Sequence, residues 1–209
     1  MKHIEVFEKH VHKCVQTNYQ GVKNVYDILG RNVRRFALFT TDKAVAPVNA
    51  YGHSKALAEK YLDRFDNVQI FRWGNVLGST GSVLPYLCHC AMTGEVFNIT
   101  DPTMTRFWIH IDDAIKFVLD NKTYTGKRAI YPPMVSANLD VLISTVEFCL
   151  GKKIKRKTID KRPGEKQHEC MVADYHKPRF YSFEKTLNTT QLEEVIRPWI
   201  RNWRKQNTK

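Results

Sequence analysis

Short apolar runs alternate with longer segments of helical periodicity along this chain, and this alternation restricts its fold more than any other feature. The runs at 35–40 and 68–73 have the length and composition of buried strands. Apolar residues recur at helical spacing over 8–29, 51–65 and 83–92. Strands that alternate with helices form parallel sheets that helices cover on both faces. We therefore expect an α/β fold.

The alternation continues to the end of the chain. Gly30 is expected to end the first helix in the left-handed conformation. The remaining expected elements are a strand at 96–99, an extended run at 105–111, a helix that Asp112 and Asp113 cap and that runs to 119, a strand at 128–131, a helix at 138–150, a basic strand, and a final amphipathic helix through 192–203. The Trp199 and Trp203 face of that last helix is expected to pack on the C-terminal lobe or on a partner subunit.

The chain is basic, with 33 Lys and Arg against 21 Asp and Glu and a net charge of +12. Such a charge favours an anionic partner, which is a nucleotide, a nucleic acid or an acidic surface. The basic residues are densest at 152–157, where a solvated basic strand is an equally good interpretation. No helix-turn-helix, zinc or RNA-binding motif accompanies the charge, so nucleic-acid binding is not the favoured hypothesis.

The five cysteines indicate a reducing compartment, because their number is odd and their spacing matches no disulfide framework. With no apolar leader and no window of about 20 apolar residues, we expect a cytoplasmic protein that does not cross a membrane. Cys88-His89-Cys90 lacks a second ligand pair at zinc-finger spacing. These cysteines are therefore expected to be buried on a helix, and no metal is expected.

The residues most indicative of chemistry follow the first predicted strand. Thr41-Asp42-Lys43 stands at the end of that strand, and Tyr51-Gly-His-Ser-Lys55 opens the next helix. Residues four apart share a helix face, where the Lys55 ammonium can lower the pKa of the Tyr51 phenol. A tyrosine with a lowered pKa can act as a base toward a sugar hydroxyl. A surface Tyr and Lys on an ordinary helix is the alternative.

Further ordered blocks accompany this one, at 2–3, 17–21, 72–83, 100–108 and 162–169. They include Arg72-Trp-Gly-Asn75, Met104-Thr105-Arg106-Phe-Trp and Arg162-Pro-Gly-Glu165-Lys-x-His-Glu169. With these blocks the chain resembles the extended short-chain dehydrogenase/reductase family. Within that family it is most similar to the UDP-N-acetylglucosamine 4,6-dehydratases of capsule and pseudaminic acid pathways, and Tyr51 points to the C5-inverting type.

The resemblance implies an incomplete Rossmann-like parallel sheet with a smaller C-terminal substrate-binding lobe. Residues 1–125 would be the C-terminal part of an NAD-binding domain, and 126–209 mainly the lobe and the last helix. The family's G-x-G-x-x-G fingerprint does not occur, and the glycines over 74–81 have the wrong spacing. Met1 aligns within the cofactor domain, so we expect the chain alone to bind NAD weakly or not at all.

The implied function is NAD(P)-dependent dehydration of UDP-N-acetylglucosamine to the 4-keto-6-deoxy sugar, for surface polysaccharide or glycan biosynthesis. By resemblance, Tyr51 deprotonates the C4 hydroxyl, and Lys55 holds the nicotinamide ribose and tunes Tyr51. Asp42 then protonates the leaving C6 hydroxyl, while Lys43 moves the proton at C5. The other implied cofactor contacts are Asn18, Thr41 and His3.

The implied UDP-sugar pocket is lined by Asn75, Thr105, Arg106, Arg162 and Glu165. Arginines suit a diphosphate, because a planar guanidinium makes paired, charge-assisted hydrogen bonds to phosphate oxygens. A salt bridge within the lobe is the alternative for Arg106. His168 and Glu169 are equally well interpreted as helix-surface residues.

Other functional readings remain open from the sequence. The chain is alternatively a non-catalytic nucleotide-sugar or partner-binding remnant of such an enzyme, or another nucleotide-sugar epimerase or dehydratase. Its expected partners are a UDP-sugar together with either further copies of the chain or a complementary N-terminal polypeptide.

Overall fold

The computed structural model describes residues 4–124, 129–172 and 180–207. The expected boundary at 125/126 lies outside these residues. In chain order the elements are α1 (Ile4–Lys9), α2 (Val11–Val15), the π-helical η1 (Gln16–Gln20), α3 (Gly21–Ile28), the 3₁₀ turn η2 (Gly30–Asn32), β1 (Phe36–Thr41), the 3₁₀ turn η3 (Asp42–Ala44), α4 (Ala50–Leu62), β2 (Val68–Trp73), β3 (Asn75–Val76), α5 (Val83–Thr93), β4 (Phe97–Ile99), β5 (Thr105–Ile109), α6 (Ile111–Asp120), β6 (Val135–Asn138), α7 (Leu139–Leu150), β7 (Arg156–Thr158) and α8 (Thr189–Asn207).

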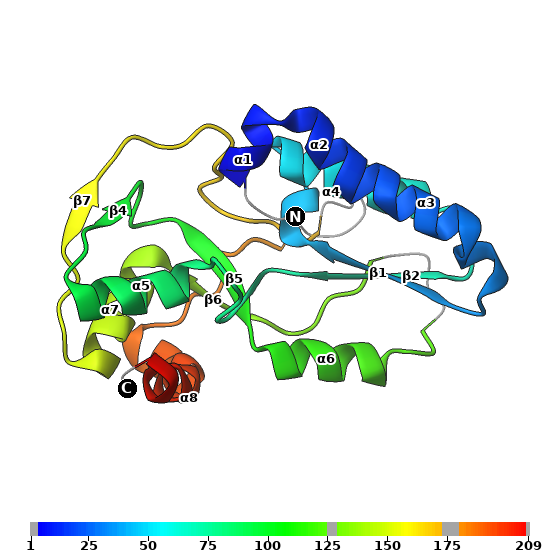
Figure 1. Cartoon of the computed structure of the whole chain (residues 1–209). Helices are drawn as coiled ribbons and strands as arrows, with labels where there is room; N and C mark the ends of the chain where they lie inside the picture. Colours follow the sequence, from blue (N-terminus) through cyan, green and yellow to red (C-terminus); the bar gives the residue numbers. More distant parts are fainter. Residues whose placement is uncertain (1–3, 125–128, 173–179, 208–209) are drawn as a thin grey trace.

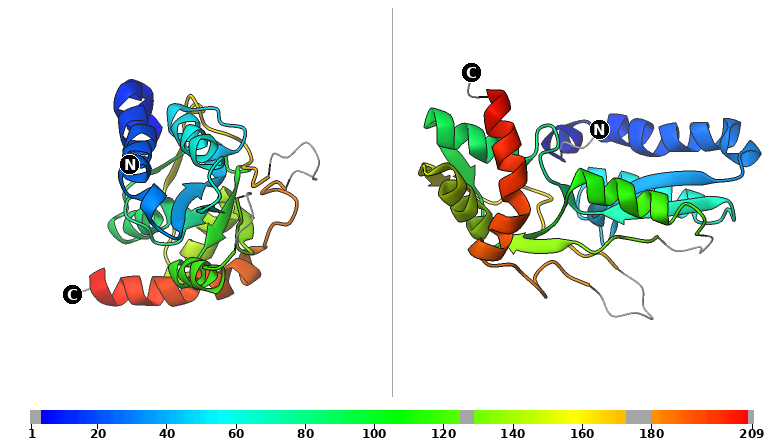
Figure 2. Two further views of the ribbon diagram at one scale, coloured as in Figure 1. Left: turned by 90° about the vertical axis from the view of Figure 1, so that its right-hand side faces the viewer. Right: turned by 90° about the horizontal axis from the view of Figure 1, so that it is seen from below.

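The parallel pair β1–β2 forms one half of the molecule, with Leu38 opposite Ile70. Helices α3 and α4 lie over one face of this pair and α6 over the other (Figures 1 and 2). Tyr26, Leu38 and Leu62 are buried in the core between the strands and the first helix layer. The sheet continues through Ile130, which forms a parallel bridge with Phe71. The two predicted strands and their helical cover are confirmed.

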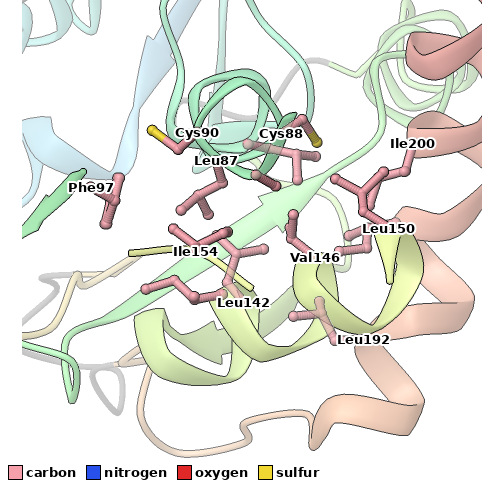
Figure 3. Close-up of a cluster of buried hydrophobic side chains, with 14 of the residues drawn as sticks. Leu87, Cys88, Cys90, Phe97, Leu142, Val146, Leu150, Ile154, Leu192 and Ile200 are labelled. Atoms are coloured by element: carbon pink, nitrogen blue, oxygen red, sulfur yellow. The ribbon is translucent and has the colours of Figure 1, made fainter. Parts of the chain in front are cut away.

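A second core fills the other half, between α5, α7 and α8 (Figure 3). Leu87, Leu142 and Leu192 are fully buried there, and each such side chain contributes about 1.5–3 kcal/mol through burial. Cys88 and Cys90 are also fully buried, on opposite sides of α5 (Figure 3), which confirms the expected buried helix cysteines. In the described part of the chain, no three His, Cys, Asp or Glu side chains cluster closely enough to hold a metal ion.

Helix α8 closes this second half, with Trp199 and Trp203 stacked at a ring distance of 6.4 Å and packed against the core. This confirms that the tryptophan face covers the C-terminal lobe. Its exposed side carries Arg201, Arg204 and Lys205. None of the helices in the described ranges combines the length and apolar character that a membrane crossing requires.

The β1–β2 sheet is parallel as predicted, but a separate three-stranded sheet, in the order β3-β5-β6, contains an antiparallel pair that was not expected. β5 pairs in parallel with β3 but antiparallel with β6, with Thr105 opposite Asn138. Neither β3 nor β6 was expected, because β3 has two residues and β6 contains the polar Ser136 and Asn138. Periodicity reports which face a strand buries, but it carries no information on strand direction.

The first helix also ends differently from the prediction. Gly30 lies in a 3₁₀ turn. Packing requires a glycine at this position, because a Cβ would lie 2.2 Å from Cδ2 of Tyr26. The left-handed helix ends are instead Gly94 after α5 and Gly151 after α7, with φ of 76° and 63°. The predicted single helix over 8–29 is a succession of α1, α2, η1 and α3.

Candidate functional site

A cavity of about 800 Å³ lies where the carboxyl ends of β1 and β2 face the C-terminal half. Thr41 and Trp73 end these strands and line it on one side. Residues of α5, β4 and β5 line it on the other, including Tyr86, Asn98 and Trp108. Ligands of open α/β sheets bind outside the carboxyl ends of the strands, and the volume suits a small molecule.

Asp42 and Lys43 stand at this edge because the chain turns into η3 directly after β1. The Thr41 hydroxyl donates to Asp42 Oδ1 at 2.8 Å and accepts from the Lys43 backbone N–H at 3.4 Å. Asp42 is fully buried, and its Oδ1 also accepts from Lys43 Nζ at 3.1 Å. Its Oδ2 is buried with no hydrogen-bond partner in the described structure. One carboxylate oxygen is therefore hydrogen bonded and the other is buried without a partner, and Asp42 itself lies outside the cavity lining.

The Lys43 ammonium is surrounded by acceptors from three parts of the chain. Its Nζ lies 3.1 Å from Asp42 Oδ1, 3.2 Å from Asn75 Oδ1 and 3.8 Å from Glu169 Oε1. Burial by itself lowers the pKa of Lys43, but the two carboxylates outweigh it and the pKa is raised. Lys43 is therefore a buried cation at neutral pH.

A helix-surface position was one of the two interpretations of Glu169, and that alternative is wrong. It is 3% exposed and follows His168, which bridges Thr105 in β5. Lys166 Nζ lies 3.2 Å from Glu169 Oε2 as an ion pair, without the alignment of a hydrogen bond. The signal available in the sequence was the apolar Cys170-Met171-Val172 run directly after Glu169, which indicates a buried strand-like segment rather than a helix surface.

Tyr51 lines the cavity from the first turn of α4. The Asn49 side chain begins this helix by accepting from the Gly52 N–H at 2.7 Å. Tyr51 is 9% exposed and stacks on Phe7 at a ring distance of 6.3 Å. Burial raises the pKa of Tyr51, and the Lys43 charge opposes that rise without cancelling it.

The expectation that Lys55 lowers the Tyr51 pKa is therefore wrong, because the pKa is raised and the neighbouring cation that lowers it is Lys43. Lys55 is half-buried one turn further along α4, outside the cavity lining. Burial lowers the pKa of Lys55. No hydrogen bond or ion pair with another residue in the described ranges engages its ammonium group.

The other expected cofactor contacts have three different outcomes. Thr41 lines the cavity. Asn18 is 3% exposed and lies outside the lining, where its Nδ2 donates to the Ser54 hydroxyl at 3.2 Å and joins the N-terminal helices to α4. His3 lies outside the described residues.

Four of the five expected substrate residues line the cavity, namely Asn75, Arg106, Arg162 and Glu165. Glu165 Oε2 accepts from the Thr100 hydroxyl at 2.9 Å. The fifth, Thr105, is 4% exposed and lies outside the lining. Its hydroxyl meets His168 Nδ1 at 2.8 Å and Ser182 Oγ at 2.6 Å, so it joins β5 to two neighbouring segments.

Arg106 lines the cavity but uses its guanidinium to hold the backbone of the cavity wall. It donates to the carbonyls of Thr105 at 2.8 Å, Lys166 at 2.9 Å and Gln167 at 3.2 Å. Within the described residues Arg106 forms no salt bridge, so the alternative considered for it does not hold. Arg106 therefore fixes the segment that carries Lys166 and Glu169.

Comparisons with known proteins agree with this architecture. A family model described as "Polysaccharide biosynthesis protein" matches residues 1–191. An inverting UDP-N-acetylglucosamine 4,6-dehydratase of Campylobacter jejuni is 35% identical over 194 residues, which cover 88% of this chain and 57% of that protein. A UDP-glucose 4-epimerase of Rickettsia typhi is 31% identical over 183 residues, which cover 83% and 54%.

Among solved structures, Pen from Bacillus thuringiensis aligns with a TM-score of 0.84 at 23% identity, over 94% of this chain and 72% of that one. This likeness confirms the expected Rossmann-like α/β fold. The chain spans little more than half the length of the curated relatives it matches.

Proposed function

Because the chain belongs to the polysaccharide biosynthesis protein family, we propose that it acts on a nucleotide sugar and dehydrates UDP-N-acetylglucosamine to the 4-keto-6-deoxy sugar. The observation that carries the proposal is that Lys43, paired with the buried Asp42, lines one cavity together with Tyr51. Elimination of water needs an acid for the leaving hydroxyl and a separate group for the C5 proton. The product would serve surface polysaccharide or glycan biosynthesis.

The residues at the start of α4 fit the nicotinamide end of an NAD(P) cofactor. Lys55 is a half-buried cation without a partner in the described ranges, which the hydroxyls of a ribose can satisfy. Tyr51, Lys55 and Thr41 would hold this end. When bound, the cofactor would supply a reversible oxidation at C4 and so make the C5 proton acidic.

Tyr51 is proposed to accept the proton of the C4 hydroxyl. Its side chain faces the cavity, and the positive charge of Lys43 favours the phenolate. Because burial raises the pKa of Tyr51, the phenolate fraction grows toward alkaline pH. The rate is therefore expected to rise with pH, and Tyr51→Phe should abolish that dependence together with most of the activity.

Asp42 and Lys43 are proposed to divide the proton transfers at C6 and C5. Oδ2 of Asp42, which has no hydrogen-bond partner in the described structure, is the atom proposed to carry a proton to the leaving C6 hydroxyl. Lys43 contacts Asp42 Oδ1, so its ammonium stabilises the carboxylate that remains after that transfer. For turnover we propose that the proton between Lys43 Nζ and Asp42 first moves to Asp42. The neutral Lys43 amine then takes the C5 proton while the Asp42 carboxyl protonates the leaving C6 hydroxyl, and the pair ends as ammonium and carboxylate.

The cavity wall opposite this pair is proposed to bind the nucleotide. Arg162 is exposed at the cavity and carries a charge suited to a diphosphate. The Glu165 N–H donates to the Arg162 carbonyl, and the Glu165 carboxylate can accept from a ribose hydroxyl. Asn75, whose Oδ1 accepts from Lys43 Nζ, is proposed to face the reacting part of the sugar. Arg106 supports the wall behind them.

A complementary polypeptide or a second copy of the chain is proposed as partner. In the described sheet β1 pairs with β2 alone, and Phe39 in β1 is half exposed. A strand edge without a partner presents backbone N–H and C=O groups that can pair with another strand, so this edge is suited to further strands. Solution mass with and without a polypeptide that carries the family's glycine-rich segment measures this association.

The decisive test is mass spectrometry of UDP-N-acetylglucosamine incubated with the chain and NAD, with and without that polypeptide. Loss of one water from the sugar is the expected result, and Asp42→Asn should prevent it. An unchanged sugar in both incubations, while the chain binds UDP-N-acetylglucosamine, would contradict dehydration and indicate the non-catalytic binding protein.

Epimerisation is the second candidate, favoured by the 31% identity to the Rickettsia typhi protein named UDP-glucose 4-epimerase. It needs the Tyr51 base but no acid for a leaving hydroxyl. The same incubation separates the two, because an epimer keeps the mass of the substrate and differs from it in its proton NMR spectrum.

A further inference from the structure

We propose that Glu169 is a positioning residue for Lys43, and that Lys166 holds Glu169 in place from the other side. The part that Lys43 plays in turnover rests on the proposed function, whereas its position and charge do not. The inference stands on the arrangement of four charged side chains behind the cavity: Asp42, Lys43, Lys166 and Glu169.

The four charges alternate in sign in the order Asp42, Lys43, Glu169 and Lys166. Lys43 Nζ contacts Asp42 at 3.1 Å and Glu169 at 3.8 Å, and Glu169 contacts Lys166 at 3.2 Å. The side chains of Lys43, Glu169 and Lys166 are 16%, 4% and 12% exposed, so water screens these contacts little. Moving any one of them leaves an uncompensated buried charge, which is strongly unfavourable.

Glu169 is set by the backbone around it rather than by the cavity. Its N–H donates to the Ser182 hydroxyl at 2.9 Å, and the Ser182 N–H donates to its carbonyl at 2.9 Å. The preceding residues are held by Arg106, which donates to the Lys166 and Gln167 carbonyls. The carboxylate is therefore delivered to Lys43 from a rigid support.

The same segment also holds the loop that follows Lys43. Lys166 Nζ donates to the Val45 carbonyl at 2.7 Å, and the Gly164 carbonyl accepts from Asn49 Nδ2 at 2.8 Å. Ala46 lies between these contacts with a φ of +43°, a conformation that persists only where its surroundings impose it. The segment over 164–169 thus contacts the loop between Lys43 and Tyr51 on both sides of Ala46.

This arrangement predicts what Glu169 does for Lys43. Asp42 and Glu169 favour the ammonium, Arg106 and burial oppose it, and Tyr51 is the remaining titratable group that interacts with it. Without the Glu169 charge, one of the three acceptors around the Lys43 ammonium is lost. Burial, which favours the neutral amine, then has a larger share in setting its charge state. Lys43 then deprotonates more easily, and its Nζ is no longer held against Asp42.

The first test measures Lys43 itself and needs no turnover. In protein with ¹³Cε-labelled lysine, the Lys43 signal is identified by its loss in Lys43→Met. The wild-type signal should stay at its ammonium position up to the highest pH at which the protein is folded. In Glu169→Gln its titration midpoint should move to lower pH, and Glu169→Asp should restore part of the difference.

Glu147→Gln is the matched control, because Glu147 is a buried carboxylate with two cations in the other half of the molecule. Its Lys43 titration should equal that of the wild type. Glu169→Ala is a second variant in case Glu169→Gln does not fold, and it should move the midpoint in the same direction because it also removes the carboxylate. Lys166→Met removes a neighbouring cation and should not lower the midpoint. An unchanged midpoint in a folded Glu169→Gln or Glu169→Ala protein would overturn the proposal.

The second test measures turnover with the partner polypeptide present where it is required. Glu169→Gln should lower kcat about tenfold to a hundredfold with KM within about twofold, because a displaced proton-transfer group affects the chemical step and not binding. Its pH profile should move with the Lys43 titration. A raised KM at unchanged kcat would contradict the positioning role, whereas an inactive wild type with the NMR result intact contradicts the proposed function alone.

Discussion

Two buried carboxylates, Glu147 in the C-terminal half and Glu169 beside the cavity, each face two cations, but they do so in opposite ways. Glu147 accepts from the Ile154 N–H and Lys153 Nζ, both at 2.9 Å, and meets Arg156 at 3.2 Å. The Lys153 and Arg156 side chains are 90% and 31% exposed. Their charges remain in water while the carboxylate is fully hydrogen bonded.

Around Glu169 both cations are interior, and the neighbouring Asp42 keeps one oxygen without a partner in the described structure. Burial of charges without full hydrogen bonding is costly and rarely serves stability alone. A cluster whose carboxylate is fully hydrogen bonded and whose cations reach water, as at Glu147, serves stability. A cluster with buried cations and an unpartnered carboxylate oxygen beside a cavity, as at Glu169, is suited to a ligand.

The largest expected difference between the two clusters is in turnover. Asp42→Asn removes the carboxylate that has an unpartnered oxygen and should lower the dehydration rate about 10²- to 10⁴-fold. Glu147→Gln should leave that rate within about twofold, since it is remote from the cavity. Initial rates of UDP-N-acetylglucosamine dehydration check both, and a comparable loss in the two variants would show that the clusters do not differ in role.

The next difference is in folding stability. Lys43→Met leaves Asp42 and Glu169 buried with less compensation and should cost about 3–5 kcal/mol. Glu147→Gln leaves cations that water can solvate and should cost about 1–3 kcal/mol. Denaturant unfolding of both variants gives these free energies, and equal losses would contradict the distinction.

The pH dependence of stability sharpens the same contrast. Burial opposes ionisation of Glu147, but the Ile154 N–H, Lys153 and Arg156 outweigh it and its pKa is below 4.5. The stability from this shift is present above pH 4.5 and is lost as the pH falls below it. The difference in unfolding free energy between wild type and Glu147→Gln should therefore be constant near neutrality and shrink in acid.

The stability that Lys43 contributes depends on pH in the opposite direction. Its folded pKa is above 10.5, so its contribution is complete below that pH and is lost only as the pH rises further. The Lys43→Met difference in unfolding free energy should consequently decrease as the pH rises above 10.5. A difference that stays constant through that range would indicate that Lys43 is not the stabilising cation.

The smallest expected effect is that of Lys153, the exposed cation beside Glu147. Lys153→Met removes a side chain that is 90% exposed and should change stability by less than about 1 kcal/mol. Lys166→Met removes an interior cation and should cost more, about 1–3 kcal/mol. Thermal unfolding of the pair ranks them, and the reverse order would refute the comparison.

The elements that could be predicted are those whose signal is local. β2 runs over Val68–Trp73 as expected, and α5 and α7 lie within a residue or two of their predicted ends. Asp42, Lys43 and Tyr51 could be identified because they lie within ten residues of one another along the chain, between a strand and a helix. Local backbone preferences and apolar spacing suffice to bring such residues to one edge of a sheet.

By itself, then, the amino-acid sequence determined the α/β order, the edge that carries the cavity, the amine and phenol that line it, and the buried acid beside the amine. Only tertiary packing decided that β6 runs antiparallel to β5, that Thr105 turns away from the cavity, and that Glu169 and Lys166 lie behind Lys43. It also made Lys43 rather than Lys55 the cation that lowers the Tyr51 pKa. These outcomes depend on contacts between segments far apart in the chain, and no local period or spacing encodes the distance between two such charges.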